Sequence, residues 1–168
     1  FWGNKIANDD CKDDCGHEVP INLYNQDELD RIFKTGNELL VKNGFAAPKY
    51  FMAGGWMGGP QVLEAASKNG ILYDLSPVPT HLLKDHIKYY PLYESLQQLW
   101  SLTTAISQPN SYATRSGVIT QFPNNAATMD YQSTKGVFEL YKSFAHILKE
   151  RPELDLYLNV GFYQETAE

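Results

Sequence analysis

The stretch KYFMAGGWMGGPQVLEAASKNGILYDLS, residues 49–76, decides the fold. It opens as a short strand-forming run, turns through a glycine-rich segment at residues 54–60, and continues as a helical run that Gly70 closes. A second strand-forming run follows at residues 71–76. Two strands joined by a helix pair in parallel through a right-handed crossover, so this stretch predicts an α/β fold with a parallel sheet.

The segment before this unit adds another strand and another helix. Residues 18–24 alternate apolar and polar side chains, as a half-buried strand does. A helical pattern covers residues 25–44, with Asn25 or Asp27 as its N-cap and Gly44 as its stop. The chain therefore predicts a repeated alternation of strands and helices.

The second half of the chain resumes this alternation after an irregular stretch. We expect an insertion over residues 77–113, with one helix inside it at residues 92–104. The elements predicted beyond it are a strand at residues 117–123, a helix at residues 135–152 and a closing strand at residues 154–165. With no internal repeat and no low-complexity linker, residues 1–168 are expected to form a single domain.

Composition and charge argue against two classes of partner. The chain has 20 acidic and 14 basic residues, a net charge of −6, and no run rich in Lys or Arg, which argues against nucleic acid. Its apolar runs fall short of the roughly 20 residues that a membrane span needs, and no leader pattern opens it, so we expect a soluble chain whose export signal was removed or lies upstream. The 13% aromatic content predicts a surface or cleft built from rings.

The two cysteines, Cys11 and Cys15, lie close together in a polar stretch. Their spacing allows a disulfide in an irregular loop, and two free thiols are the alternative. A zinc site would need about four ligands, and only His17 lies nearby. A disulfide would favour an exported protein, so we expect a secreted or periplasmic location.

Five phrases of the sequence, in this order, resemble the polysaccharide deacetylase (NodB-homology) family. They are GHEVPINLY, FMAGGW, QVLEAASKNGILYDLS, FPNNAATMDY and GFYQETA, which together span about 150 residues. The resemblance implies a distorted (β/α) barrel with parallel strands. It also implies a divalent metal, usually zinc, held by two histidines and an aspartate, which polarises an acetamide carbonyl and activates water.

The chemical positions of that family carry other residues in this chain. Asn22 and Tyr24 stand where the family has metal-binding histidines, Met52 where it has an arginine, and Tyr163 where it has a late histidine. Asparagine and un-ionised tyrosine are poor zinc ligands, and methionine cannot pair with a carboxylate. The resemblance therefore predicts a domain that has lost the metal reaction and uses no cofactor.

The family's first strand, which ends in a functional Asp-Asp, also lacks a counterpart here. We expect the chain to be the C-terminal portion of an incomplete barrel. The strand that contains Ile21 would then lack a neighbour, and a covering polypeptide is expected to pair with it, either an N-terminal fragment or a second subunit.

The leading hypothesis is a domain that binds a glycan, such as a peptidoglycan-like carbohydrate, or a protein through the former active-site cleft. Aromatic rings stack on sugar faces and amides bind hydroxyl groups. The candidate ligand-binding residues are Asn22, Tyr24, Trp56, Asn124, Asn125, Asp130, Tyr131, Tyr163, Gln164 and Glu165. For Trp56 the alternative is packing, for Asn124 and Asn125 a turn after Pro123, and for Glu165 an exposed terminus.

Two other functions stay open at this point. One is an active carbohydrate amide hydrolase, with zinc and a rearranged site completed by an N-terminal segment. The other is a structural or virulence-associated subunit that acts through its surface. A metal assay separates the enzyme from the binding domain, and glycan screening separates the binding domain from the structural subunit.

Overall fold

The computed structural model describes residues 20–83, 93–126 and 132–161. These residues form an α/β fold around a four-stranded sheet of order β1-β2-β4-β3. The strands are β1 (Tyr50–Phe51), β2 (Tyr73–Asp74), β3 (Asn110–Ala113) and β4 (Val118–Gln121). Because β1, β2 and β4 run parallel, the predicted α/β class and the parallel pairing across residues 49–76 are confirmed.

The helices of the described residues follow the predicted order. They are α1 (Gln26–Lys42), α2 (Pro60–Lys68), α4 (Tyr93–Leu99) and α5 (Thr134–Glu150), with 3-10 turns η1 (Ile21–Leu23), η2 (Gly54–Trp56) and η3 (Thr80–Leu82). Asn25, rather than Asp27, caps α1 in a reciprocal capping box with Glu28. Gly44 and Gly70 follow α1 and α2 with left-handed φ angles of 86° and 84°, as the sequence predicts.

The predicted strand at residues 18–24 is wrong over its described part. Residues 21–23 form the 3-10 turn η1 after Pro20, and the Leu23 amide donates to the Pro20 carbonyl at 3.0 Å. The turn buries Tyr24 and leaves Leu23 50% exposed, which is the reverse of the predicted alternation of apolar and polar faces. Alternation alone could not distinguish a short turn from a short strand.

Two further expectations about strands need correction. The insertion at residues 77–113 ends in β3, which pairs antiparallel with β4, so the sheet is mixed and not purely parallel. The predicted closing strand at residues 154–165 is described only to Gly161; residues 154–160 form no strand, and Gly161 forms a single bridge. Side-chain amides hold this segment, as described below.

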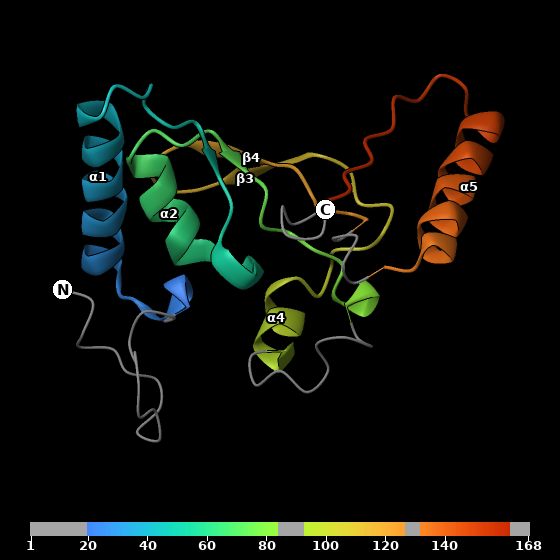
Figure 1. Cartoon of the computed structure of the whole chain (residues 1–168), viewed down its shortest axis with the longest axis horizontal. Helices are drawn as coiled ribbons and strands as arrows, with labels where there is room; N and C mark the ends of the chain where they lie inside the picture. Colours follow the sequence, from blue (N-terminus) through green and yellow to red (C-terminus); the bar gives the residue numbers. More distant parts are fainter. Residues whose placement is uncertain (1–19, 84–92, 127–131, 162–168) are drawn as a thin grey trace.

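Two apolar clusters support the fold. The first joins α1, α2 and the sheet through Tyr24, Leu29, Phe33, Val62, Leu63, Ala65, Ala66, Ile71 and Ile119. The second surrounds α4 and consists of Trp56, Met57, Val78, Leu83, Leu96 and Trp100. Figure 1 shows α1 and α2 side by side, and both figures place α5 at the other end of the molecule. None of the helices in the described parts of the chain has the length and apolar character of a membrane span.

The face of the sheet turned away from α1 and α2 carries a row of rings. Tyr50 stacks on Tyr73 with ring centres 4.7 Å apart, and Tyr73 meets Phe122 edge to face at 5.8 Å. Phe122 in turn meets Tyr157 at 5.5 Å. Phe51, on the opposite face, contacts Phe33 of α1. Helices therefore cover one face of the sheet, and an aromatic row crosses the other.

Candidate functional site

The described candidate residues do not form one open cleft. Tyr24 and Trp56 are each only 4% exposed, Tyr24 in the first cluster and Trp56 in the second. Asn124 and Asn125 are also buried, whereas Met52 is 47% exposed. For Trp56, this placement matches the packing alternative. Five candidates lie outside the described residues: Asp130, Tyr131, Tyr163, Gln164 and Glu165. Cys11 and Cys15, the predicted disulfide, also lie outside them.

Asn125 acts as a clamp between two loops. Its side-chain amide donates to the Ser107 carbonyl at 3.0 Å and to the Tyr157 carbonyl at 2.8 Å. Its side-chain oxygen accepts from the Asn159 amide at 2.8 Å, and the Ala126 amide donates to the Asn159 carbonyl at 2.9 Å. The side chain thus takes the place of a neighbouring strand for residues 157–159.

Gln108 adds a second clamp on the same segment. The Tyr157 amide donates to the Gln108 side-chain oxygen at 2.7 Å, and the Gln108 side-chain amide donates to the Tyr157 carbonyl at 3.1 Å. These two bonds imitate one rung of a β-ladder. The loops that follow α4 and β4 are therefore joined to the chain that follows α5.

Asp74 is the buried acid of this region. It lies on the helix-covered face at the end of β2 and is fully buried. Its Oδ1 accepts from the Ser76 amide at 2.9 Å and its Oδ2 from the Gln121 side-chain amide at 2.9 Å. The Ser76 hydroxyl accepts from the Ala53 amide at 2.9 Å, so the cluster links the ends of β1, β2 and β4. Burial raises the pKa of the Asp74 carboxyl above its usual 3.8, and the hydrogen bonds from Ser76 and Gln121 oppose this rise.

Replacing Asp74→Asn should stabilise the protein at neutral pH. A carboxyl whose pKa rises on folding contributes stability that is full below its unfolded pKa and is lost as the pH rises through its folded pKa. Asparagine removes that loss, and the Gln121 amide can rotate to present its oxygen to the new side chain. Urea unfolding should give the variant a higher free energy of unfolding at pH 7, with the difference narrowing towards pH 4. A pH-independent difference would contradict this role.

A pocket of about 340 Å³ lies next to this cluster. It opens between the start of α2, the end of α4 and the β3–β4 pair. Its lining residues are Gly59, Pro60, Leu63, Pro77, Leu99, Trp100, Ser101, Leu102, Thr103, Ser107, Asn110, Tyr112, Gln121 and Pro123. All of these side chains are neutral, and hydroxyl and amide groups interrupt an apolar wall. Such a lining suits an uncharged ligand with both polar and apolar faces.

Several predicted residues support this pocket from behind. The Trp100 indole donates to the Trp56 carbonyl at 2.8 Å, so the turn at Trp56 positions one pocket wall. Asn125 holds the carbonyl of the pocket residue Ser107. The backbone amide of Asn124 donates to the Pro77 carbonyl at 2.7 Å. The side-chain oxygen of Asn124 is buried and has no hydrogen-bond partner within the described residues. Three of the predicted residues therefore lie behind the pocket, and none of the predicted residues lines it.

Asn22 and Tyr24, which the resemblance matched to metal-binding histidines, do not line this pocket. Asn22 belongs to η1, where its carbonyl accepts from the Gln61 side-chain amide at 2.6 Å. Tyr24 packs in the first cluster. Within residues 20–83, 93–126 and 132–161, no three side chains of His, Cys, Asp or Glu gather in a metal-binding group.

Sequence reasoning missed the residues that line the pocket and the buried acid Asp74 beside it. Asp74 had a usable signal, because it alternates with Tyr73 and so puts an acid on the helix-covered side of a predicted strand. Trp100, Asn110 and Gln121 had none, because they converge only through contacts distant in the sequence. No family model matches the chain, and no curated protein or solved structure matches it significantly.

Proposed function

We propose that this chain is a carbohydrate-binding domain on a polysaccharide-deacetylase-like scaffold, with an incomplete (β/α) barrel of the NodB-homology type. The observation that carries the proposal is the neutral, partly aromatic pocket beside the carboxyl ends of β2 and β4. Ligand sites of α/β folds lie at that end of the sheet. The five phrases that resemble the deacetylase family add the link to sugars.

The size and lining of the pocket favour a neutral sugar. A volume of about 340 Å³ is near the lower end of the range for small-molecule sites, which fits one or two sugar rings. Tyr112 supplies an aromatic wall, and Asn110, Gln121 and Ser107 supply amide and hydroxyl groups. An N-acetylated sugar offers both an apolar face and an acetamide for these groups.

The positions of two family residues support binding without the metal reaction. Tyr24 is 4% exposed in a cluster with apolar side chains of α1 and α2, so little of its side chain is available to hold a metal. Met52 offers no charge to orient a carboxylate. In this proposal the chain still binds the sugar but no longer catalyses zinc-dependent hydrolysis.

Titration calorimetry with N-acetylated chitotetraose tests the proposal. Binding is expected for the wild type, and Asn110→Ala should weaken it about 3- to 10-fold, the effect of one neutral hydrogen bond. Asn110 is exposed, so its loss should leave the fold intact. Gln97→Ala, which removes an exposed amide from α4 outside the pocket, is the matched control and should bind like the wild type.

Three outcomes would overturn the proposal. No binding across a panel of acetylated and deacetylated oligomers would favour a structural subunit. Equal weakening by Asn110→Ala and Gln97→Ala would remove the pocket as the site. Acetate release, with about one zinc per chain by elemental analysis, would restore the hydrolase.

A further inference from the structure

The outer edge of β1 is open within the described part of the chain. β1 is the last strand in the order β1-β2-β4-β3, and its only pairing is with β2. The carbonyls of Lys49 and Phe51 accept from amides of the β2 segment, at 2.9–3.0 Å. In a parallel ladder the backbone groups of successive residues point to opposite sides of the strand. The carbonyls of Lys49 and Phe51 face β2, so the backbone amides and carbonyls of Tyr50 and Met52 face outward.

Helix α1 lies where it would cover one further strand. α2 connects β1 to β2 and packs beside α1, and α1 in turn leads into β1. By the crossover rule, such a helix starts from a strand next to β1, but η1 stands there in the sequence. Leu40 continues the buried stripe of Leu29 on α1, yet it is 41% exposed. The apolar side of α1 is therefore only partly covered at Leu40.

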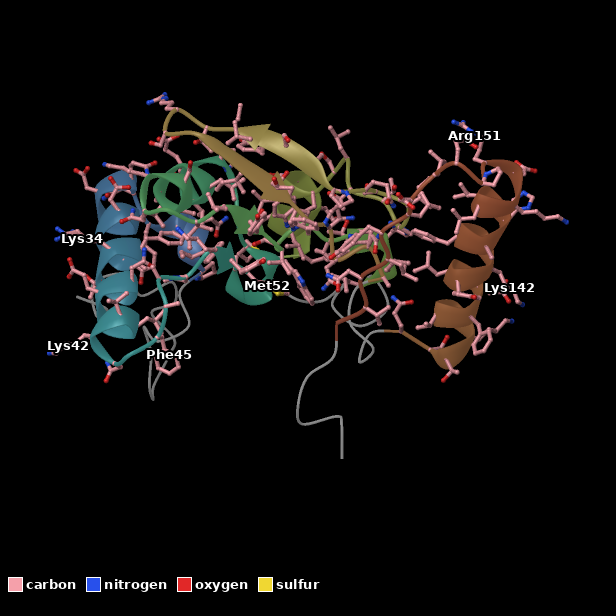
Figure 2. All side chains as sticks on the ribbon, turned by 90° about the horizontal axis from the view of Figure 1, so that it is seen from above. Lys34, Lys42, Phe45, Met52, Lys142 and Arg151 are labelled. Atoms are coloured by element: carbon pink, nitrogen blue, oxygen red, sulfur yellow. The ribbon has the colours of Figure 1, made fainter. Side chains whose placement is uncertain are left out.

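The aromatic row ends at the same edge. Tyr50 is its last ring, stacked on Tyr73 on one side and 65% exposed. Met52 follows on the same edge and is also exposed (Figure 2). A strand added beside β1 would place one side chain against the Tyr50 ring and the next one under α1.

We propose that the β1 edge accepts an extended segment of another polypeptide, paired in parallel, with apolar or β-branched side chains on both of its faces. The outward backbone groups at Tyr50 and Met52 can form strand hydrogen bonds with such a partner. The Tyr50 ring on one face and the apolar side of α1 on the other favour apolar side chains in the partner. The opposite edge, β3, fits this partner poorly because it carries exposed Asn110 and Ser111. The sequence analysis expected a covering polypeptide beside the segment that contains Ile21. In this proposal the polypeptide pairs with β1 instead.

Backbone methylation of a probe peptide tests strand addition with the whole chain. The probe is a capped peptide of alternating valine and threonine between terminal lysines, made unmodified and in two N-methylated versions. One version is methylated at every valine and the other at every threonine. Only one edge of the peptide can face β1, so one version should bind at least tenfold more weakly and the other like the unmodified peptide. Bound peptide should also slow amide hydrogen exchange at Tyr50 and Met52.

A charge variant provides the second measurement. Met52→Lys should weaken peptide binding at least tenfold, because a charged side chain at an edge opposes strand addition. Phe138→Lys adds the same charge at an exposed position of α5, away from β1 and outside the pocket, and should leave binding unchanged. The proposal would be overturned if the peptide did not bind, or if both methylated peptides bound equally well. It would also be overturned if bound peptide protected amides of β3 instead of β1, or if the amides of Tyr50 and Met52 were already protected from exchange in the free chain.

Discussion

Replacing Asn125→Ala is expected to lower the free energy of unfolding by about 1–3 kcal/mol, the cost of leaving a part-buried backbone amide without a partner. The side chain makes three hydrogen bonds of 2.8–3.0 Å, to Ser107, Tyr157 and Asn159. Gln108 also donates to the Ser107 and Tyr157 carbonyls, at 3.3 and 3.1 Å, so the Asn159 amide bears most of the loss. Urea unfolding measures the free energy, and hydrogen exchange at Asn159 locates it.

The neighbouring residue gives the matched control. Asn124→Ala removes the same side chain one position away, where the oxygen has no hydrogen-bond partner within the described residues. Its loss of stability should be distinctly smaller, and exchange at Asn159 should not change. Equal losses for the two variants would show that general packing after Pro123, rather than the clamp, holds this region.

Replacing Trp100→Ala is expected to cost about 3–5 kcal/mol, the range for removal of a large aromatic side chain from a core. Trp100 is 8% exposed, joins the second cluster and forms a wall of the pocket. Loss of its indole should also abolish chitotetraose binding, because the pocket loses a wall. Urea unfolding and calorimetry on the same samples measure both effects.

Two further variants separate packing from hydrogen bonding at this position. Trp100→Phe keeps a ring but loses the donor to the Trp56 carbonyl, which still accepts from the Gly58 amide at 2.8 Å, so the loss should be smaller. Tyr141→Ala removes an exposed ring from α5 and should stay within about 0.5 kcal/mol of the wild type. If Trp100→Ala were as mild as Tyr141→Ala, the second cluster would not support the pocket.

Much of the fold was predictable because its signals are local. The capping box at Asn25 and the closing glycines act within one helical turn, so the bounds of α1 and α2 came close to expectation. The parallel pairing of β1 with β2 followed from the strand–helix–strand order of residues 49–76. For the candidate site, the sequence identified the asparagine pair after Pro123 but not what the pair does.

The sequence by itself determined where α1 and α2 begin and end and that the strands of residues 49–76 lie in parallel, whereas the helix predicted at residues 92–104 ends already at Leu99. Only the tertiary structure decided the antiparallel pairing of β3 with β4, the clamp at Asn125 and the wall at Trp100. The physical reason is the length scale of the contacts. The partners of Asn125, Asp74 and Trp100 lie 32, 47 and 44 positions away, and no local pattern specifies which amide or carbonyl will meet each side chain.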